Sequence, residues 1–452
     1  MIAGILHLNS KTKYGMTGKN IPMYLFRPFD PKEHLYIVGC SQRDTSTNLL
    51  ALIEPLDMTQ RIPRGNLVQV LGPCGDWAAE REAIHWTYRP HKQPKVDLSA
   101  LVPPITTGRL DLREFSTFNI DPPGCRDVDD CITLGYDKSL VITIADVGGW
   151  LVKNPGLYAF AKNGQTLYDT GRAVRPVFPP ELSEGLFSLL PNQDRYGVSV
   201  ILRAGEEPEW KLSLVRVGRS YTYDEADRHT EIKEAIERVC GVVLGNDSHK
   251  WVETLMVVYN IFMARMLMAM DAGILRSHAE PNMEALKRYN VICPDATWLA
   301  ESSAAYCEVA TRQTHWGMGS VPYTHMTSPI RRWADAYNQM VLHCEVYPIE
   351  LEELNRIRKK AKRHDRDIFF LDQLRVPRPV MGTVLDVLGE KSKVWVADWK
   401  RIVSIPTTEH ESGTKLRIEY YLDMNQPTWK RRMVIHASRD CPAPQSLEQV
   451  AP

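Results

Sequence analysis

The chain has 452 residues, more than one hydrophobic core usually spans, so we expect two or three domains. Its 55 basic residues balance 55 acidic ones and 44% of its residues are hydrophobic, which excludes a disordered, fibrous or strongly basic protein. No uninterrupted run of about 18 apolar residues and no signal-peptide pattern is present, and the nine cysteines form no C-x-x-C pair, so we expect no membrane contact, no structural zinc and a reducing compartment: the cytoplasm, with the nucleus or an organelle also compatible.

Residues 1–105 predict a small β-barrel. Short strand-like runs follow one another here, among them MYLFRPF, HLYIVGC and NLVQVLG, and Gly, Pro and Asn separate them. Many short strands with turn residues at close spacing are typical of such barrels.

The segment 117–134, TFNIDPPGCRDVDDCITL, carries the strongest chemical signal. It holds four carboxylates between two apolar runs that can form strands: Asp121, Asp127, Asp129 and Asp130. Two prolines and a glycine exclude a helix, so these residues are expected on a turn. Carboxylate oxygens suit Mg²⁺ or Mn²⁺, and four of them repel one another unless a cation neutralises them. The run 140–147, LVITIADV, predicts a buried strand that supports the turn.

A solvated acidic loop would explain the same residues if the segment stood alone. An EF-hand is excluded, because the glycine at its sixth position and the glutamate at its twelfth are missing. Two metal ions about 4 Å apart can activate a hydroxide and stabilise charge on a phosphodiester. An arginine beyond the phosphate would complete such a site, since its planar guanidinium is bidentate and stays charged.

Helical periodicity dominates the middle of the chain. We expect helices over 224–241, 250–272 and 350–374. The Leu and Met stripe of the second helix predicts a core face, and Glu253 and Asn260, seven residues apart, share one face of that helix. The basic run of the third helix, RIRKKAKRHDR, is better explained by a solvated face with one phosphate-facing edge than by a dedicated site.

Residues 377–440 alternate apolar and polar positions between glycine turns, which predicts a second small barrel. The tail, 441–452, is expected to be disordered.

Four ordered blocks over about 230 residues resemble the ribonuclease II and R family, whose catalytic RNB domain also forms the exonuclease of the eukaryotic exosome. The first block is RLDLR with IDPPGCRDVDD and IADVGGWL, and the second is YDTGRAVRPVFPPELSEGLFSLLP. The third is ILRSHAEPNMEALKRY, and the fourth is HWGMGSVPYTHMTSPIRRWADAYNQMVLH. Four blocks in order are far more specific than any one motif.

The resemblance implies an α+β multidomain fold. A mixed α/β RNB catalytic domain would span 106–376, between an OB-type, cold-shock-like barrel at 1–105 and an S1-like barrel at 377–440. It also implies that VLGPCGDWAAEREAIHWTY leads from the last strand of the first barrel into a helix.

The resemblance also assigns roles to residues. Asp121, Asp127, Asp129 and Asp130 would hold Mg²⁺, or Mn²⁺, with Asp129 and Arg331 catalytic and Arg331 on the scissile phosphate. Tyr168 would pack against the terminal nucleotide. The remaining predicted RNA-binding residues are Glu253, Asn260, Arg276, His278, Ser328 and Arg332.

Two departures from the family pattern bear on these roles. The second glutamate of the family's E-E-x-M-x-x-x-N helix is replaced by Thr254. The segment between Ala226 and Glu253 is also shorter than in the family and lacks the phenylalanine that sandwiches terminal bases with the tyrosine. The second departure leaves the length of the end product open.

We therefore expect a processive 3′-to-5′ exoribonuclease that hydrolyses single-stranded RNA to nucleoside 5′-monophosphates with two Mg²⁺ ions. Two alternatives remain: a catalytically inactive RNA-binding regulator with the RNB fold, and an unrelated DNA nuclease or phosphatase with a carboxylate metal site. The expected partner is single-stranded RNA, bound by a monomer, with membership of a larger RNA-decay complex left open.

Overall fold

The structure is a computed structural model that describes residues 1–58, 60–89, 93–406, 410–423, 426 and 428–439. The chain forms two compact units, each built from segments far apart in the sequence. The first unit comprises residues 1–91, 281–301 and 362–452, and the second comprises 92–280 and 302–361. The predicted tail at 441–452 lies outside the described residues.

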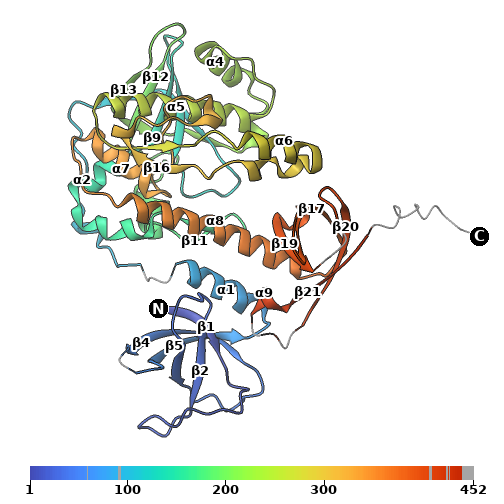
Figure 1. Cartoon of the computed structure of the whole chain (residues 1–452). Helices are drawn as coiled ribbons and strands as arrows, with labels where there is room; N and C mark the ends of the chain where they lie inside the picture. Colours follow the sequence, from blue (N-terminus) through green and yellow to red (C-terminus); the bar gives the residue numbers. More distant parts are fainter. Residues whose placement is uncertain (59, 90–92, 407–409, 424–425, 427, 440–452) are drawn as a thin grey trace, which may run out of the picture. The chain divides into compact units, whose positions relative to one another are not determined.

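Five strands of the first unit close into the barrel that the N-terminal runs predict (Figure 1). They are β1 (Ile2–Leu6), β2 (Met23–Pro28), β3 (Tyr36–Gly39), β4 (Leu49–Asp57) and β5 (Arg64–Pro73). Their order is β1-β2-β3-β5-β4, and β4 pairs back with β1 in antiparallel register. Leu6, Phe26 and Val38 fill the interior, so period-two alternation accounts for this barrel.

Helix α1 (Trp77–Tyr88) follows the barrel, as expected from the family pattern. Asp76 caps it by accepting the N–H of Ala79 at 2.8 Å. Its Glu80 is buried and accepts a hydrogen bond from Nη1 of Arg432 at 2.5 Å. This ion pair joins the N-terminal and C-terminal segments of the first unit.

The C-terminal part of the first unit is a five-stranded antiparallel sheet. Its order is β19 (Arg401–Pro406), β18 (Lys391–Val396), β17 (Val380–Leu388), β20 (Lys415–Leu422) and β21 (Met433–Arg439). The described strands form an open, half-barrel sheet in place of a closed ring, and its core includes the end of α8 (Leu351–Leu374) through Phe370 and Leu374. The short helix α9 (Trp429–Arg432) precedes β21.

Residues 281–301 group with this sheet. They form α6 (Met283–Ile292) and η4 (Pro294–Ala300), and Trp298 lies edge-on to Trp395 at 5.3 Å. Compactness therefore groups the chain differently from the predicted domains, whose boundaries at 105, 376 and 440 stay predictions.

A seven-stranded mixed sheet organises the second unit. Its order is β14 (Arg219–Tyr221), β7 (Ser116–Ile120), β8 (Asp130–Leu134), β9 (Leu140–Ala145), β12 (Asp194–Leu202), β13 (Glu209–Arg216) and β6 (Leu110–Asp111). The outermost pairs are parallel and the inner pairs antiparallel. All six residues of β9 are buried, which confirms the strand predicted at 140–147.

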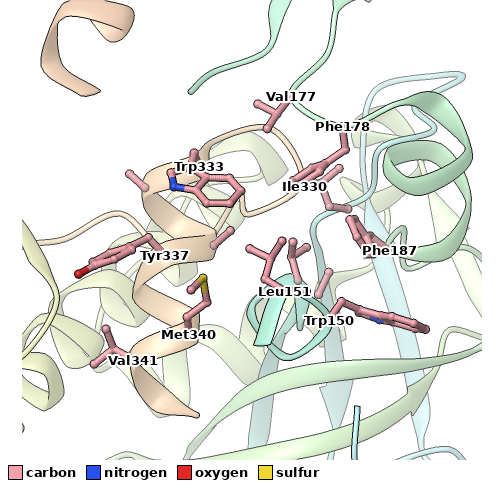
Figure 2. Close-up of a cluster of buried hydrophobic side chains, with 14 of the residues drawn as sticks. Trp150, Leu151, Val177, Phe178, Phe187, Ile330, Trp333, Tyr337, Met340 and Val341 are labelled. Atoms are coloured by element: carbon pink, nitrogen blue, oxygen red, sulfur yellow. The ribbon is translucent and has the colours of Figure 1, made fainter. Parts of the chain in front are cut away.

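Two hydrophobic clusters cover the two faces of this sheet. On one face, α2 (Val147–Lys153) and α7 (Trp333–Leu342) contribute Trp150, Leu151, Trp333 and Met340 to a cluster that also holds Phe178 (Figure 2). The other face is covered by α3 (Tyr223–Ala226), α4 (Thr230–Cys240) and α5 (Ser248–Ala269). The helix predicted at 224–241 is thus two helices.

Helix α5 is, among the described helices, long and apolar enough to cross a membrane by length and composition alone. Core helices share these properties, and Trp251, Leu255, Tyr259 and Met263 of α5 are fully buried in the cluster on the sheet. The core face predicted for this helix is confirmed.

Candidate active site

The four aspartates lie at one end of the central sheet, on the connection from β7 to β8. Gly124 has a φ of +77°, which a glycine adopts without strain and which turns the chain after the two prolines. Ser188 holds the second half of the loop, because its Oγ accepts the N–H of Val128 at 3.0 Å and donates to the carbonyl of Arg126 at 2.7 Å. The loop is therefore anchored on the segment 188–191, SLLP, at the end of the second sequence block.

Asp129 and Arg331 form the centre of the site. Asp129 is buried, and its Oδ1 accepts the N–H of Ile330 while its Oδ2 accepts Nε–H of Arg331, both at 2.9 Å. The Arg331 side chain is 47% exposed, against 2% for Asp129, so the carboxylate holds one edge of the guanidinium and leaves the other toward solvent. Burial raises the pKa of Asp129 to about 7, and the charge of Arg331 opposes that shift.

Asp127 is engaged by Tyr168. The tyrosine lies on β10 (Leu167–Asp169), which pairs with β11 (Arg172–Arg175), and its hydroxyl donates to Oδ2 of Asp127. Burial, and then the charge of Asp127, raise the pKa of Tyr168, so the hydroxyl stays protonated. The thiol of Cys125 lies 3.7 Å from the other oxygen of Asp127.

Asp121 and Asp130 form no ion pair among the described residues, so the protein stabilises their charged forms poorly. Burial raises the pKa of Asp121 to about 6, and burial and then Asp121 raise the pKa of Asp130 well above its ordinary value. Oδ2 of Asp121 is buried and has no hydrogen-bond partner among the described residues. A bound cation would remove this penalty.

The structure does not gather the four aspartates around one point. Within the described part of the chain, no three acidic, histidine or cysteine side chains are arranged to hold a metal ion. Arg331 and Tyr168 occupy oxygens of Asp129 and Asp127. In donor chemistry and charge the set still fits a hard divalent cation, with Asp121 and Asp130 the least neutralised members.

The predicted RNA-binding residues separate into three groups. Ser328 belongs to the centre, because its Oγ lies 3.1 Å from Nη2 of Arg331. Arg332 instead pairs with the fully buried Asp335 at 2.8 Å. Its guanidinium is therefore already engaged and is not free to bind a phosphate.

Asn260 and Glu253 of α5 differ in exposure. Asn260 is buried and saturated: it donates to Tyr323 and Thr327 and accepts the N–H of Met326 at 2.9 Å. Glu253 is exposed and pairs with Lys250 at 2.6 Å. Of these two residues, Glu253 is therefore the one whose side chain is accessible to a ligand.

Arg276 and His278 belong to a different cluster. They lie on and just after β15 (Ile274–Ser277), which pairs with β16 (Ala305–Glu308). Arg276 is buried, and the ring of His278 lies 4.9 Å from that of His315.

Two functional neighbours were missed in the sequence. Burial, then the charges of Asp121 and Asp130, raise the pKa of Tyr223 to about 12. Its ring stacks on His249 at 3.7 Å. The only sequence signal was its position at the start of a Tyr-Asp-Glu-Ala run.

A buried ionic network was also missed. Asp146 caps α2 and is bound by Nη2 of Arg109 at 2.7 Å and by Nε2 of His343 at 2.9 Å. Although burial acts to raise it, the pKa of Asp146 lies below its ordinary value, because His343 and then Arg109 stabilise the charged form. The network ties α2 to the end of α7, the helix that begins directly after Arg331 and Arg332.

Comparison with known proteins identifies the family. The RNB domain family matches residues 109–240 and 237–347. The chain is 27% identical over 316 residues to Ribonuclease R of Chlamydia pneumoniae, which covers 51% of this chain and 47% of that protein. It is 24% identical over 450 residues to the probable exosome complex exonuclease RRP44 of Caenorhabditis elegans, covering 74% and 46%. The chain spans about half the length of these relatives.

Solved structures with the same fold include one that is named as a ribonuclease and one that is named as a pseudonuclease. The apo form of Mycoplasma genitalium RNase R superimposes with a TM-score of 0.72 at 17% identity, over 96% of this chain and 89% of that one. Yeast Ssd1, a pseudonuclease, gives a TM-score of 0.63 at 15% identity, over 92% and 66%. Because the RNB domain match extends over more than half of its residues, the chain belongs to the ribonuclease II and R family of RNB domain proteins.

Proposed function

We propose that the chain is a 3′-to-5′ exoribonuclease that hydrolyses single-stranded RNA processively to nucleoside 5′-monophosphates. The observation that carries the proposal is the Asp129–Arg331 pair, which places a partly exposed guanidinium beside the aspartate loop, where Asp121 and Asp130 form no ion pair among the described residues. The names of the relatives, ribonucleases R and exosome exonucleases, support an exonuclease acting on RNA.

Arg331 would bind the phosphate that reacts. Asp129 holds its Nε edge and Ser328 accepts from Nη2, so the guanidinium is oriented before substrate arrives. A pre-oriented, permanently charged fork stabilises negative charge that develops on phosphate oxygens without reorganising.

The aspartates would hold Mg²⁺, with Asp121 and Asp130 as its first ligands and Asp127 and Asp129 beside them. Bound Mg²⁺ would supply an activated water and neutralise the phosphate. The chain's own contribution is to concentrate carboxylate oxygens in a buried loop, where a cation would stabilise the charged forms of Asp121 and Asp130.

Tyr168 would position the terminal nucleotide. Its hydroxyl is fixed on Asp127, which orients the half-buried ring beside the reacting centre. Each base stacked on an aromatic ring contributes roughly 1–3 kcal/mol, so a short remnant with few stacked bases would dissociate.

An RNA-binding regulator without catalysis is the second candidate. It is favoured by the absence, among the described residues, of a three-ligand metal cluster and by the fold shared with yeast Ssd1. Against it, all four aspartates and Arg331 are present.

One assay separates these candidates. RNA and DNA single strands labelled at the 5′ end are incubated with the chain in Mg²⁺ or in EDTA. We expect a ladder that shortens from the 3′ end of RNA, with nucleoside 5′-monophosphates as product, only in Mg²⁺. Nucleoside diphosphates in phosphate buffer would reveal phosphorolysis, cutting of circular RNA would reveal an endonuclease, and binding without any cleavage would establish the regulator.

We further propose a monomeric, cytoplasmic protein. The eight cysteines in the described residues are free thiols, as expected in a reducing compartment. Light scattering of the purified chain and fractionation of its source cells test the two statements, and co-purification tests membership of an RNA-decay complex.

A further inference from the structure

Two buried arginines of the second unit lack acidic partners. Arg276, on β15, is 7% exposed and Arg358, on α8, is 9% exposed. The Arg276 guanidinium lies 5.7 Å from the ring centre of Tyr306 and makes no side-chain hydrogen bond within the described part of the chain; its Nη1 is completely buried. Arg358 donates to the carbonyl of Ala304. Both charges are therefore buried against neutral groups.

The carboxylate whose field reaches this cluster is already engaged. Asp335 lies near enough to act on Tyr306, but its Oδ2 accepts Nη2 of Arg332 and the N–H of Ser328, both at 2.8 Å. It forms no ion pair with Arg276 or Arg358 among the described residues. The charges of Arg332 and Asp335 neutralise each other, so the positive charges of Arg276 and Arg358 remain without an acidic partner.

The pKa values of two neighbouring histidines also reflect the excess of positive charge in this cluster. His315 is 7% exposed, packs edge-on against Tyr323 at 5.3 Å, and leaves its Nδ1 buried with no partner in the described structure. Burial, then the charge of Arg276, lower the pKa of His315 to about 4. His325, whose Nδ1 lies 3.0 Å from the Tyr306 hydroxyl, also has a pKa well below its ordinary value, through burial and then the neighbouring arginines. The histidines are neutral near pH 7, so the net charge of the cluster is the positive charge of Arg276 and Arg358.

We propose that Arg276, Arg358 and His315 form a second phosphate site, which binds a backbone phosphate of the RNA away from the reacting one. Burying a guanidinium without an anion is unfavourable, so a bound anion would stabilise such a cluster. The planar fork of arginine matches phosphate oxygens, and a neutral imidazole with a free ring nitrogen can add a hydrogen bond.

RNA is the source of phosphate that the chain's connectivity favours. The segment 328–335 serves both places: Arg331 turns to Asp129 and the next residue, Arg332, turns to Asp335 beside the cluster. One strand of RNA carries phosphates at regular intervals and could engage both. The inference rests on the proposed function only in taking RNA as the source of the phosphate.

The first test asks whether an anion binds. Thermal unfolding is followed in sodium phosphate and in sodium chloride of equal ionic strength, without metal, for the wild-type chain, Arg276→Met and Arg358→Met. Phosphate should raise the wild-type midpoint and raise that of each variant less. The control is Arg113→Met, which removes an exposed arginine paired with Asp111 and should respond as the wild type does. A wild-type midpoint that ignores phosphate, or variants that gain as much as the wild type, would overturn the site.

The second test identifies the source. Binding of a fluorescent single-stranded RNA is measured in EDTA at several salt concentrations, which separates binding from hydrolysis. Arg276→Met should weaken binding about ten- to hundredfold and reduce the slope of log K against log salt by about 0.7, the value for one phosphate contact to a single strand. An unchanged slope, with phosphate still raising the wild-type midpoint, would refute RNA as the source in favour of a free phosphate. A chain that hydrolyses nothing yet shows the slope change would refute the proposed catalysis and leave this site standing.

Discussion

Nε of Arg331 lies 2.9 Å from Oδ2 of Asp129, although 202 positions separate the two residues in the chain. The carboxylate is buried and the guanidinium is half exposed, so the pair holds a cation beside the loop that carries the four aspartates. Five expected outcomes follow from this arrangement and its surroundings.

Asp129→Asn should abolish turnover while leaving RNA affinity unchanged or higher. The change removes one anionic ligand and the partner that orients Arg331, and it lowers repulsion of the phosphate. The measurement is single-turnover cleavage with parallel binding in EDTA. Asp111→Asn, an exposed carboxylate paired with Arg113, is the matched control and should cleave normally. Wild-type cleavage by Asp129→Asn would show that the residue is no ligand.

Arg331→Ala should lower kcat by orders of magnitude with little effect on binding. Each 1.4 kcal/mol or so of lost transition-state stabilisation costs about tenfold in rate. Arg332→Ala should behave differently, because it strips the ion pair from buried Asp335, and removing one partner of a buried pair costs about 3–5 kcal/mol of stability. If the defect of Arg331→Ala were mainly in binding, the residue would line the RNA path instead of facing the reacting phosphate.

Mg²⁺ should raise the thermal unfolding midpoint of the wild-type chain by about a few degrees over its value in EDTA, since an ion held by the proposed aspartate site would stabilise the folded state alone. Asp121→Asn should reduce this gain, because its buried Oδ2 is the least satisfied oxygen of the loop. Asp137→Asn, on an exposed turn where Arg203 pairs with the carboxylate, serves as the control. Equal gains in both variants would place the ion elsewhere.

Tyr168→Ala should leave longer end products than the wild type and weaken binding of short RNA roughly tenfold or more, because a stacking surface is lost. Tyr168→Phe should keep the wild-type product length, since the ring remains and only the hydrogen bond to Asp127 is removed. Product length is read from the labelled ladder. If Tyr168→Phe produced the longer remnant too, the hydroxyl and not the ring would set the end point.

Arg109→Met should lower the free energy of unfolding by about 3–5 kcal/mol, because the buried carboxylate of Asp146 then loses its arginine partner. The folded-state pKa of Asp146 lies below its unfolded value, so this network contributes stability above the unfolded pKa of about 3.9 and loses it as pH falls through the lower folded value. Acid unfolding of the wild-type chain should therefore include a loss below about pH 4. That loss should be smaller in Arg109→Met, with Arg113→Met as the control; an identical acid limb in both variants would contradict the assignment.

Local patterns predicted the elements of this fold well. Short runs between turn residues located the strands of the N-terminal barrel, a continuous β-branched apolar run located β9, and apolar periodicity located α5 and α8 within a few residues. The break between α3 and α4 was missed, because neither glycine nor proline marks it; residues 227–229 end the first helix without either.

Long-range pairing was beyond the reach of local patterns. Nothing within a few residues of Arg332 or Asp335 indicates which of the two tandem arginines would face the aspartates and which would be buried. The family resemblance ranked Arg331 first for the phosphate, which stays a prediction; the structure pairs Arg331 with Asp129 and Arg332 with Asp335. The same resemblance implied a ready metal site, whereas the structure pairs two of the four aspartates with Arg331 and Tyr168. Which carboxylates would bind a cation depends on whether the cation can replace Arg331 and Tyr168 as their partners, and the spacing of residues along the chain does not determine this.

The ion pair between Glu80 and Arg432 joins residues 352 positions apart, so it affects how the chain folds during its synthesis. All five strands of the barrel precede α1, and the barrel can close as soon as it leaves the ribosome. At about 5–20 residues per second, roughly 20 to 70 s then pass before Arg432 is made. During that interval Ala79 and Ala83 of α1 can already pack on the barrel, whereas Glu80 and Ile84 lack their partners from the C-terminal part of the first unit. One side of this helix therefore stays exposed until the rest of the chain has been made.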